Sequence, residues 1–65
     1  MAKYPDVSVP LVGEDGNAFF IIGRTTRAMK RGGVSADEIK SFMEEATSGD
    51  YDHLLSTVAK WVSVD

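Results

Sequence analysis

His53 is the single histidine of the chain, and two hydroxyl groups are its nearest candidates for shared chemistry. Ser56 and Thr57 follow it by three and four positions, so a helix would place all three side chains on one surface. A nucleophilic hydroxyl also needs a third group that orients the imidazole, and donors that stabilise an oxyanion. An exposed helix surface supplies neither of these, and we therefore expect that the protein is not an enzyme.

Carboxylates near His53 suggest metal binding as a second kind of chemistry. Glu45, Asp50 and Asp52 are ligand types that divalent cations accept. Asp50 and Asp52 are two positions apart, however, and side chains at this spacing diverge by about 160° around a helix. Both also suit a helix N-terminus, where negative charge is favourable. We expect no metal site and no cofactor, and the absence of cysteine excludes thiolate ligands.

Basic residues offer binding chemistry instead. Between Arg24 and Arg31 the chain has four basic residues and no acid, although its net charge is −3. On a helix, Phe20, Arg24, Arg27 and Arg31 form one stripe, and Lys30 lies close to it. Arginines beside an aromatic ring can hold phosphates while the ring stacks on a base. These five residues are the candidate binding residues of the sequence.

A purely structural interpretation of the same stripe stays open. Phe20 could pack under an N-terminal strand while the arginines are solvated. The acidic net charge favours this interpretation, because it weakens the long-range attraction that nucleic acid binding requires. The six acids between Asp37 and Asp52 could attract the basic helix within the fold, or they could leave a polar molecule whose basic side meets an anionic partner.

Residues 17–31, which carry the stripe, are predicted to form the first helix, with Asn17 as its cap and Gly32-Gly33 as its stop. Residues 18–22 alone could equally form the second strand of a hairpin, but the length of the pattern favours a helix. Gly23 costs about 1 kcal/mol in a helix relative to alanine, so we expect it to allow close approach of another element. The predicted buried face consists of Phe19, Ile22, Thr26 and Met29.

Two more helices are predicted over residues 35–48 and 50–62. Ser35 and Glu38 have the spacing of a capping box, and Asp50 is a favourable N-cap. The longest apolar stripe ends at Trp61, which we interpret as core rather than as an interface anchor. The predicted core is Phe19, Ile22, Met29, Ile39, Phe42, Met43, Leu54, Leu55, Val58 and Trp61.

Alternating apolar residues predict a short strand near residues 7–12, and Pro10 places it at a sheet edge because proline lacks the N–H group. The tail Val62-Ser63-Val64 alternates again and could pair with this strand. The 65 residues allow one domain, residues 1–65. The predicted fold is therefore mainly α: a compact three-helix domain with a short N-terminal β-strand that the C-terminal tail could join.

Two resemblances add expectations. The words Gly13–Phe19 and Glu45–Asp52, followed by Leu54-Leu55, resemble a group of very short uncharacterised bacterial and phage-encoded proteins. That resemblance implies a bacterial or phage cytoplasmic origin and no particular activity.

The second resemblance is architectural. Gly33-Val34, the helix through residues 42–46, Gly49-Asp50 and a helix ending at Trp61 are similar to ubiquitin-associated-type modules, which are three-helix domains that bind other proteins. The third helix is about one turn longer than in that pattern. Gly32-Gly33-Val34 also replaces the usual Met-Gly-aromatic loop, so ubiquitin binding is not implied.

Taken together, these features predict a non-catalytic protein-binding or adaptor module, with a partner protein or a second copy of the chain as its ligand. The chain has more large apolar residues than one small core needs, and the excess consists of Tyr4, Leu11, Phe20 and Ile21. The alternative is a nucleic-acid-binding accessory protein that uses the basic stripe. The longest apolar run, Ala18–Ile22, has five residues, against about 20 for a membrane span, so we expect a soluble, cytoplasmic protein without membrane contact.

Overall fold

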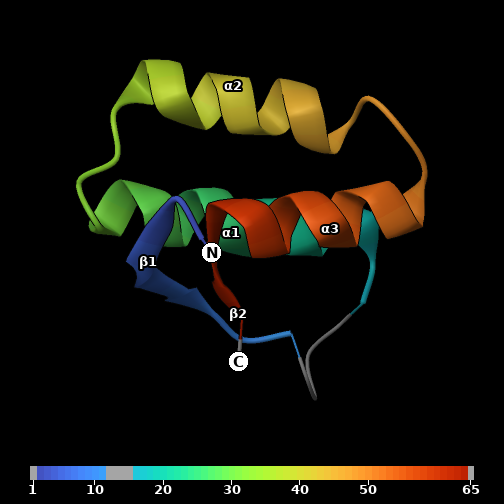
Figure 1. Cartoon of the computed structure of the whole chain (residues 1–65), viewed down its shortest axis with the longest axis horizontal. Helices are drawn as coiled ribbons and strands as arrows, with labels where there is room; N and C mark the ends of the chain where they lie inside the picture. The colour runs from blue at the N-terminus through green and yellow to red at the C-terminus, as the bar shows by residue number, and fades with distance from the viewer. Residues whose placement is uncertain (1, 12–15, 65) are drawn as a thin grey trace.

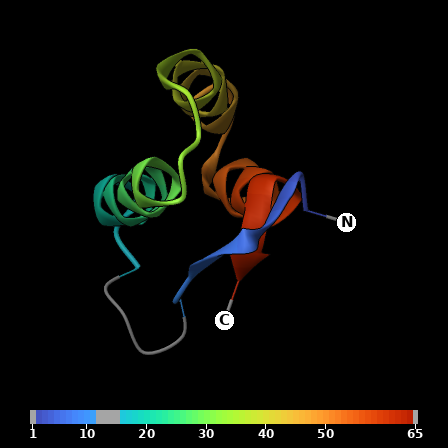
Figure 2. The same cartoon turned by 90° about the vertical axis from the view of Figure 1, so that its left-hand side faces the viewer.

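A computed structural model describes residues 2–11 and 16–64 of the protein. Three helices occupy the corners of a triangle, which Figure 2 shows nearly end-on. A two-stranded sheet lies beside α1 and α3, on the side away from α2 (Figure 1). This arrangement confirms the predicted three-helix domain with an N-terminal strand. In chain order the elements are β1 (Tyr4–Val9), α1 (Ala18–Arg31), α2 (Ala36–Ala46), α3 (Tyr51–Trp61) and β2 (Val62–Val64).

The two strands join the beginning and the end of the chain. They run parallel, and Tyr4 pairs with Val62 while Val9 pairs with Val64. The predicted pairing of the tail is therefore confirmed. The predicted bounds of the first strand, 7–12, were wrong, because β1 begins at Tyr4 and ends before Pro10. β2 begins directly after Trp61, and its first residue, Val62, pairs with Tyr4 at the start of β1. Residue 12 lies outside the described residues.

All three helices begin at the predicted caps. The side chain of Asn17 accepts a hydrogen bond from the N–H of Phe19, and Ser35 accepts one from Glu38. Asp50 likewise accepts from the N–H of His53 at 2.9 Å. Residues 18–22 are thus helical, which settles the hairpin alternative.

The helix ends are set by the chain that follows. α1 stops at Gly32-Gly33 as predicted, and Gly33 has a φ of 84°, a left-handed conformation that favours glycine. α2 ends at Ala46 rather than at residue 48. The Ser48 hydroxyl donates to the carbonyl of Glu45 at 2.7 Å, a bond that closes the last turn of α2 early.

The core confirms most of the predicted apolar residues, but Phe19 and Met43 were wrong. Their side chains are 82% and 43% exposed. On α1 the buried face is centred on Ile21 and Thr25, and the Thr25 hydroxyl donates to the carbonyl of Ile21 at 2.8 Å. The face is therefore rotated away from Phe19. The buried apolar residues are Val7, Val9, Ile21, Ala28, Met29, Phe42, Ala46, Leu54, Val58, Trp61 and Val62.

Candidate functional site

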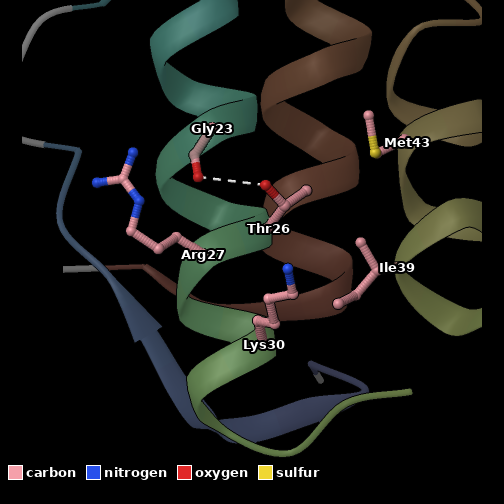
Figure 3. Close-up of a pocket in the computed structure, with 6 residues that line it drawn as sticks. All are labelled: Gly23, Thr26, Arg27, Lys30, Ile39 and Met43. Carbon is pink, nitrogen blue, oxygen red and sulfur yellow. Dashed lines mark hydrogen bonds between the residues drawn. The ribbon is translucent and has the colours of Figure 1, made fainter. Parts of the chain in front are cut away.

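The predicted basic stripe lies along one side of α1. Arg24 is half-buried, whereas Arg27 and Arg31 are exposed. Arg27 follows Arg24 by three positions and Arg31 follows Arg27 by four, so the three lie on one side of the helix. Lys30 is exposed as well, on the side of α1 that faces α2 (Figure 3). The structure therefore keeps these cations on one helix, whose first turn carries no acidic residue.

Two phenylalanines form the N-terminal end of the same exposed surface. Phe20 is 56% exposed, so it does not pack under the N-terminal strand. Phe19 is more exposed still, although the sequence placed it in the core. The pattern misled because Thr25 and Ala28, which are polar or small, contribute to the buried face in place of larger apolar residues. The exposed side of α1 thus carries two aromatic rings followed by cations.

A shallow groove of about 440 Å³ runs between α1 and α2 (Figure 3). Ile39 and Met43 extend from α2 toward α1, and Lys30 extends from α1 toward α2, whereas Arg27 points to the other side of α1. Met43 is exposed at this groove. We call this surface the α1–α2 groove; it is lined by Gly23, Thr26, Arg27, Lys30, Ile39 and Met43.

Gly23 leaves the groove open. A Cβ atom built at this position meets no atom within 4 Å. The expectation that Gly23 admits another element of the chain was therefore wrong for the described residues. Gly32 behaves differently, because a Cβ there would lie 2.9 Å from Val7. The fold explains the glycine at position 32 and leaves the one at position 23 without an internal reason.

The contacts of His53 connect α3 with the end of α2. Its Nε2 donates to the carbonyl of Glu45 at 2.8 Å and lies 3.1 Å from the Ser48 hydroxyl. The Thr57 hydroxyl approaches Nε2 at 3.4 Å but donates to the His53 carbonyl, while Ser56 is exposed. The ring thereby fastens the end of α2 to α3.

The acids considered as metal ligands are engaged separately. Glu45 accepts from Lys60 at 2.6 Å and from the Trp61 indole at 3.3 Å, and Asp50 caps α3. In the part of the chain that the structure describes, no three histidine or carboxylate side chains gather around a common point.

A polar and aromatic cluster at the ends of the chain had no clear sequence signal. The Tyr4 hydroxyl donates to Glu38 at 2.8 Å, and Lys3 pairs with the same carboxylate. The Lys3 ammonium also lies 4.6 Å from the centre of the Trp61 ring. The hydrogen bond from Lys3 lowers the pKa of Glu38, and the one from Lys60 lowers the pKa of Glu45. This cluster holds β1 on α2 and α3.

Comparison with known proteins finds no matching family, no similar curated protein and no similar solved structure. The two resemblances noted in the sequence therefore stay predictions. Among the described residues, none of the helices has the length and apolar character needed to cross a bilayer. Function is accordingly inferred from the surface of α1.

Proposed function

We propose that the protein is a non-catalytic protein-binding module that uses the exposed side of α1. The observation that carries this proposal is the exposure of Phe19 and Phe20, at 82% and 56%. Two adjacent phenylalanines on the surface of a 65-residue chain leave a large apolar area in water. Covering them with a partner would recover the hydrophobic free energy that the fold leaves unused.

The residues beside the two rings suit a protein interface. Aromatic and arginine side chains are enriched among the residues that contribute most to protein binding. Arg27 and Arg31 follow the rings on the exposed side of α1. Apolar anchors flanked by cations would give affinity at the centre of a contact and selectivity for acidic partners at its rim.

Affinity capture from the source cell tests the proposal. The immobilised protein is compared with a double variant, Phe19→Ser with Phe20→Ser, and with Val64→Ser, which removes an exposed apolar side chain from β2 instead. We expect the same proteins to be retained by the original chain and by Val64→Ser, and to be lost with the double variant. Retention of an identical set by all three would contradict the proposal. Sedimentation equilibrium of the same three proteins shows whether the partner is a second copy.

A nucleic-acid-binding function is the second candidate, and the exposure of Phe20 on the same side of α1 as Arg27 and Arg31 favours it. The ring is available for stacking and the guanidinium groups for phosphates. An electrophoretic shift assay at low salt compares Arg31→Glu with Lys40→Glu, an equal change of charge on α2. Selective loss with Arg31→Glu supports this function, and no shift at high micromolar protein excludes it.

For localisation, we propose the cytoplasm of a bacterial cell. This proposal rests on the resemblance of Gly13–Phe19 and Glu45–Asp52 to short bacterial and phage-encoded proteins. Cell fractionation with an antibody against the protein tests this placement.

A further inference from the structure

Gly23 lies in the middle of α1 at a cost that the fold does not explain. Glycine destabilises a helix interior by about 1 kcal/mol relative to alanine. At Gly32 and Gly49 a Cβ would lie within 2.9 Å and 2.8 Å of another side chain, so these two glycines are required by packing. At Gly23 the same atom would meet only open space. Packing within the described residues therefore gives no reason for this glycine.

The surroundings of Gly23 have the character of a helix-binding groove. Ile39 and Met43 supply apolar walls from α2, and Met43 is 43% exposed. Phe19 precedes Gly23 by four positions, so it lies on the same side of α1, although it is not among the residues that line the groove. Both walls are helices whose backbone groups are already paired, so the groove offers no strand edge to an extended peptide.

The charge at the groove selects the chemistry of its occupant. Lys30 lines the groove and extends toward α2, and among the described residues no carboxylate lines it. This is notable in a chain whose net charge is −3. A ligand with acidic residues beside an apolar stripe would complement both features.

We propose that the α1–α2 groove binds an acidic amphipathic helix of another protein, with the backbone of that helix approaching at Gly23. This inference rests on the proposed protein-binding function and names its partner. The apolar residues of the bound helix, spaced i, i+3 or i+4 and i+7, lie against Ile39, Met43 and Phe19. Its carboxylates face Lys30, because the guanidinium of Arg27 points to the other side of α1 (Figure 3).

A second copy of the chain is a less suitable occupant. The apolar faces of α2 and α3 are already used in the core, through Phe42, Leu54 and Trp61. A second copy would have to release one of these helices to supply a free amphipathic helix, and that would sacrifice much of its own core.

The experiment separates groove filling from unfolding. A Gly23→Leu variant places a side chain in the open space, where its Cβ meets no neighbouring atom within 4 Å, and leucine is the better helix former. A display library of randomised 16-residue peptides is selected on the unaltered protein, and the enriched peptides are then measured against Gly23→Leu and against Lys30→Glu. The melting temperatures of both variants are recorded alongside.

We expect enriched peptides with net negative charge and helical apolar spacing. Their affinity should fall by at least about tenfold with Gly23→Leu, as blocking a central contact predicts, while the melting temperature stays the same or rises. Lys30→Glu should weaken the same peptides. Equal binding to Gly23→Leu, enrichment of basic or proline-rich peptides, or no enrichment at all would overturn the inference. A dimer in sedimentation that Gly23→Leu dissociates would overturn it in favour of a second copy.

Failure here is distinguishable from failure of the proposed function. If the Phe19 and Phe20 double variant loses its captured proteins while Gly23→Leu retains them, the module binds proteins on α1 but not in the groove. If neither variant changes the captured set, the protein-binding function itself is wrong.

Discussion

The ring of Tyr4 stacks on the ring of Trp61, with 6.2 Å between their centres and an angle of 26° between their planes. Phe42 meets Trp61 edge to face, with 5.8 Å between the ring centres. Tyr4 opens β1 and Trp61 closes α3, so the contact links the two ends of the chain. In a small domain without disulfides, such a contact restrains the terminal strands against fraying.

The Tyr4 hydroxyl contributes to stability separately from its ring. Tyr4→Phe keeps the stacking on Trp61 and removes the hydrogen bond to Glu38, which retains its contact with Lys3. We expect a loss of about 1 kcal/mol in the free energy of unfolding. Tyr4→Ala should lose clearly more, because it removes the ring as well. Urea denaturation followed by circular dichroism measures both, and equal losses would show that the ring contributes nothing.

Stability should fall in acid because two carboxyl groups have lowered pKa values. The pKa values of Glu38 and Glu45 both lie below the usual 4.5, chiefly because Lys3 and Lys60 donate hydrogen bonds to these carboxylates. A carboxyl whose pKa is lower in the folded state stabilises the protein above its unfolded pKa, and this contribution is lost as pH falls through the folded value. Melting temperatures between about pH 7 and pH 3 should therefore decrease, and less steeply in Glu38→Gln. An unchanged slope in that variant would contradict the assignment.

The orientation of α1 can be tested by a pair of substitutions within its first turn. Ile21 is 2% exposed, so Ile21→Val should lower the free energy of unfolding by about 0.5–1.5 kcal/mol. Phe19→Ala removes a larger side chain, yet it should change stability by no more than about 0.5 kcal/mol because the ring is exposed. Chemical denaturation of both variants decides the matter. A larger loss at Phe19 would mean that this ring is buried in solution.

The contact between His53 and Glu45 should be structural. His53→Ala removes the hydrogen bond from Nε2 to the Glu45 carbonyl and should cost about 1 kcal/mol. His53→Gln carries an amide N–H that can reach the same carbonyl, and we expect partial recovery. Thermal unfolding measures the series. If glutamine and alanine are equivalent, the hydrogen bond does not contribute and only the packing of the ring does.

The sequence by itself determined the number of helices, their beginnings and the pairing of the two ends. These features depend on local rules: Asn17, Ser35 and Asp50 each accept a hydrogen bond from a residue two or three positions ahead. The stop at Gly33 is equally local, because its left-handed φ favours glycine. The basic stripe was also readable, since helical spacing alone keeps those residues on one helix.

Only the tertiary structure decided the rotation of α1 and the surface that follows from it. Thr25 and Ala28 pack in the core because neighbouring elements come close to small side chains, and this turns Phe19 outward. The apolar periodicity of the sequence cannot predict this rotation, because it treats every threonine as polar and every phenylalanine as a core residue. The open space at Gly23 likewise depends on how α1 and α2 pack against each other. The candidate site therefore depends on how the helices meet, whereas the helices themselves depend on their own residues.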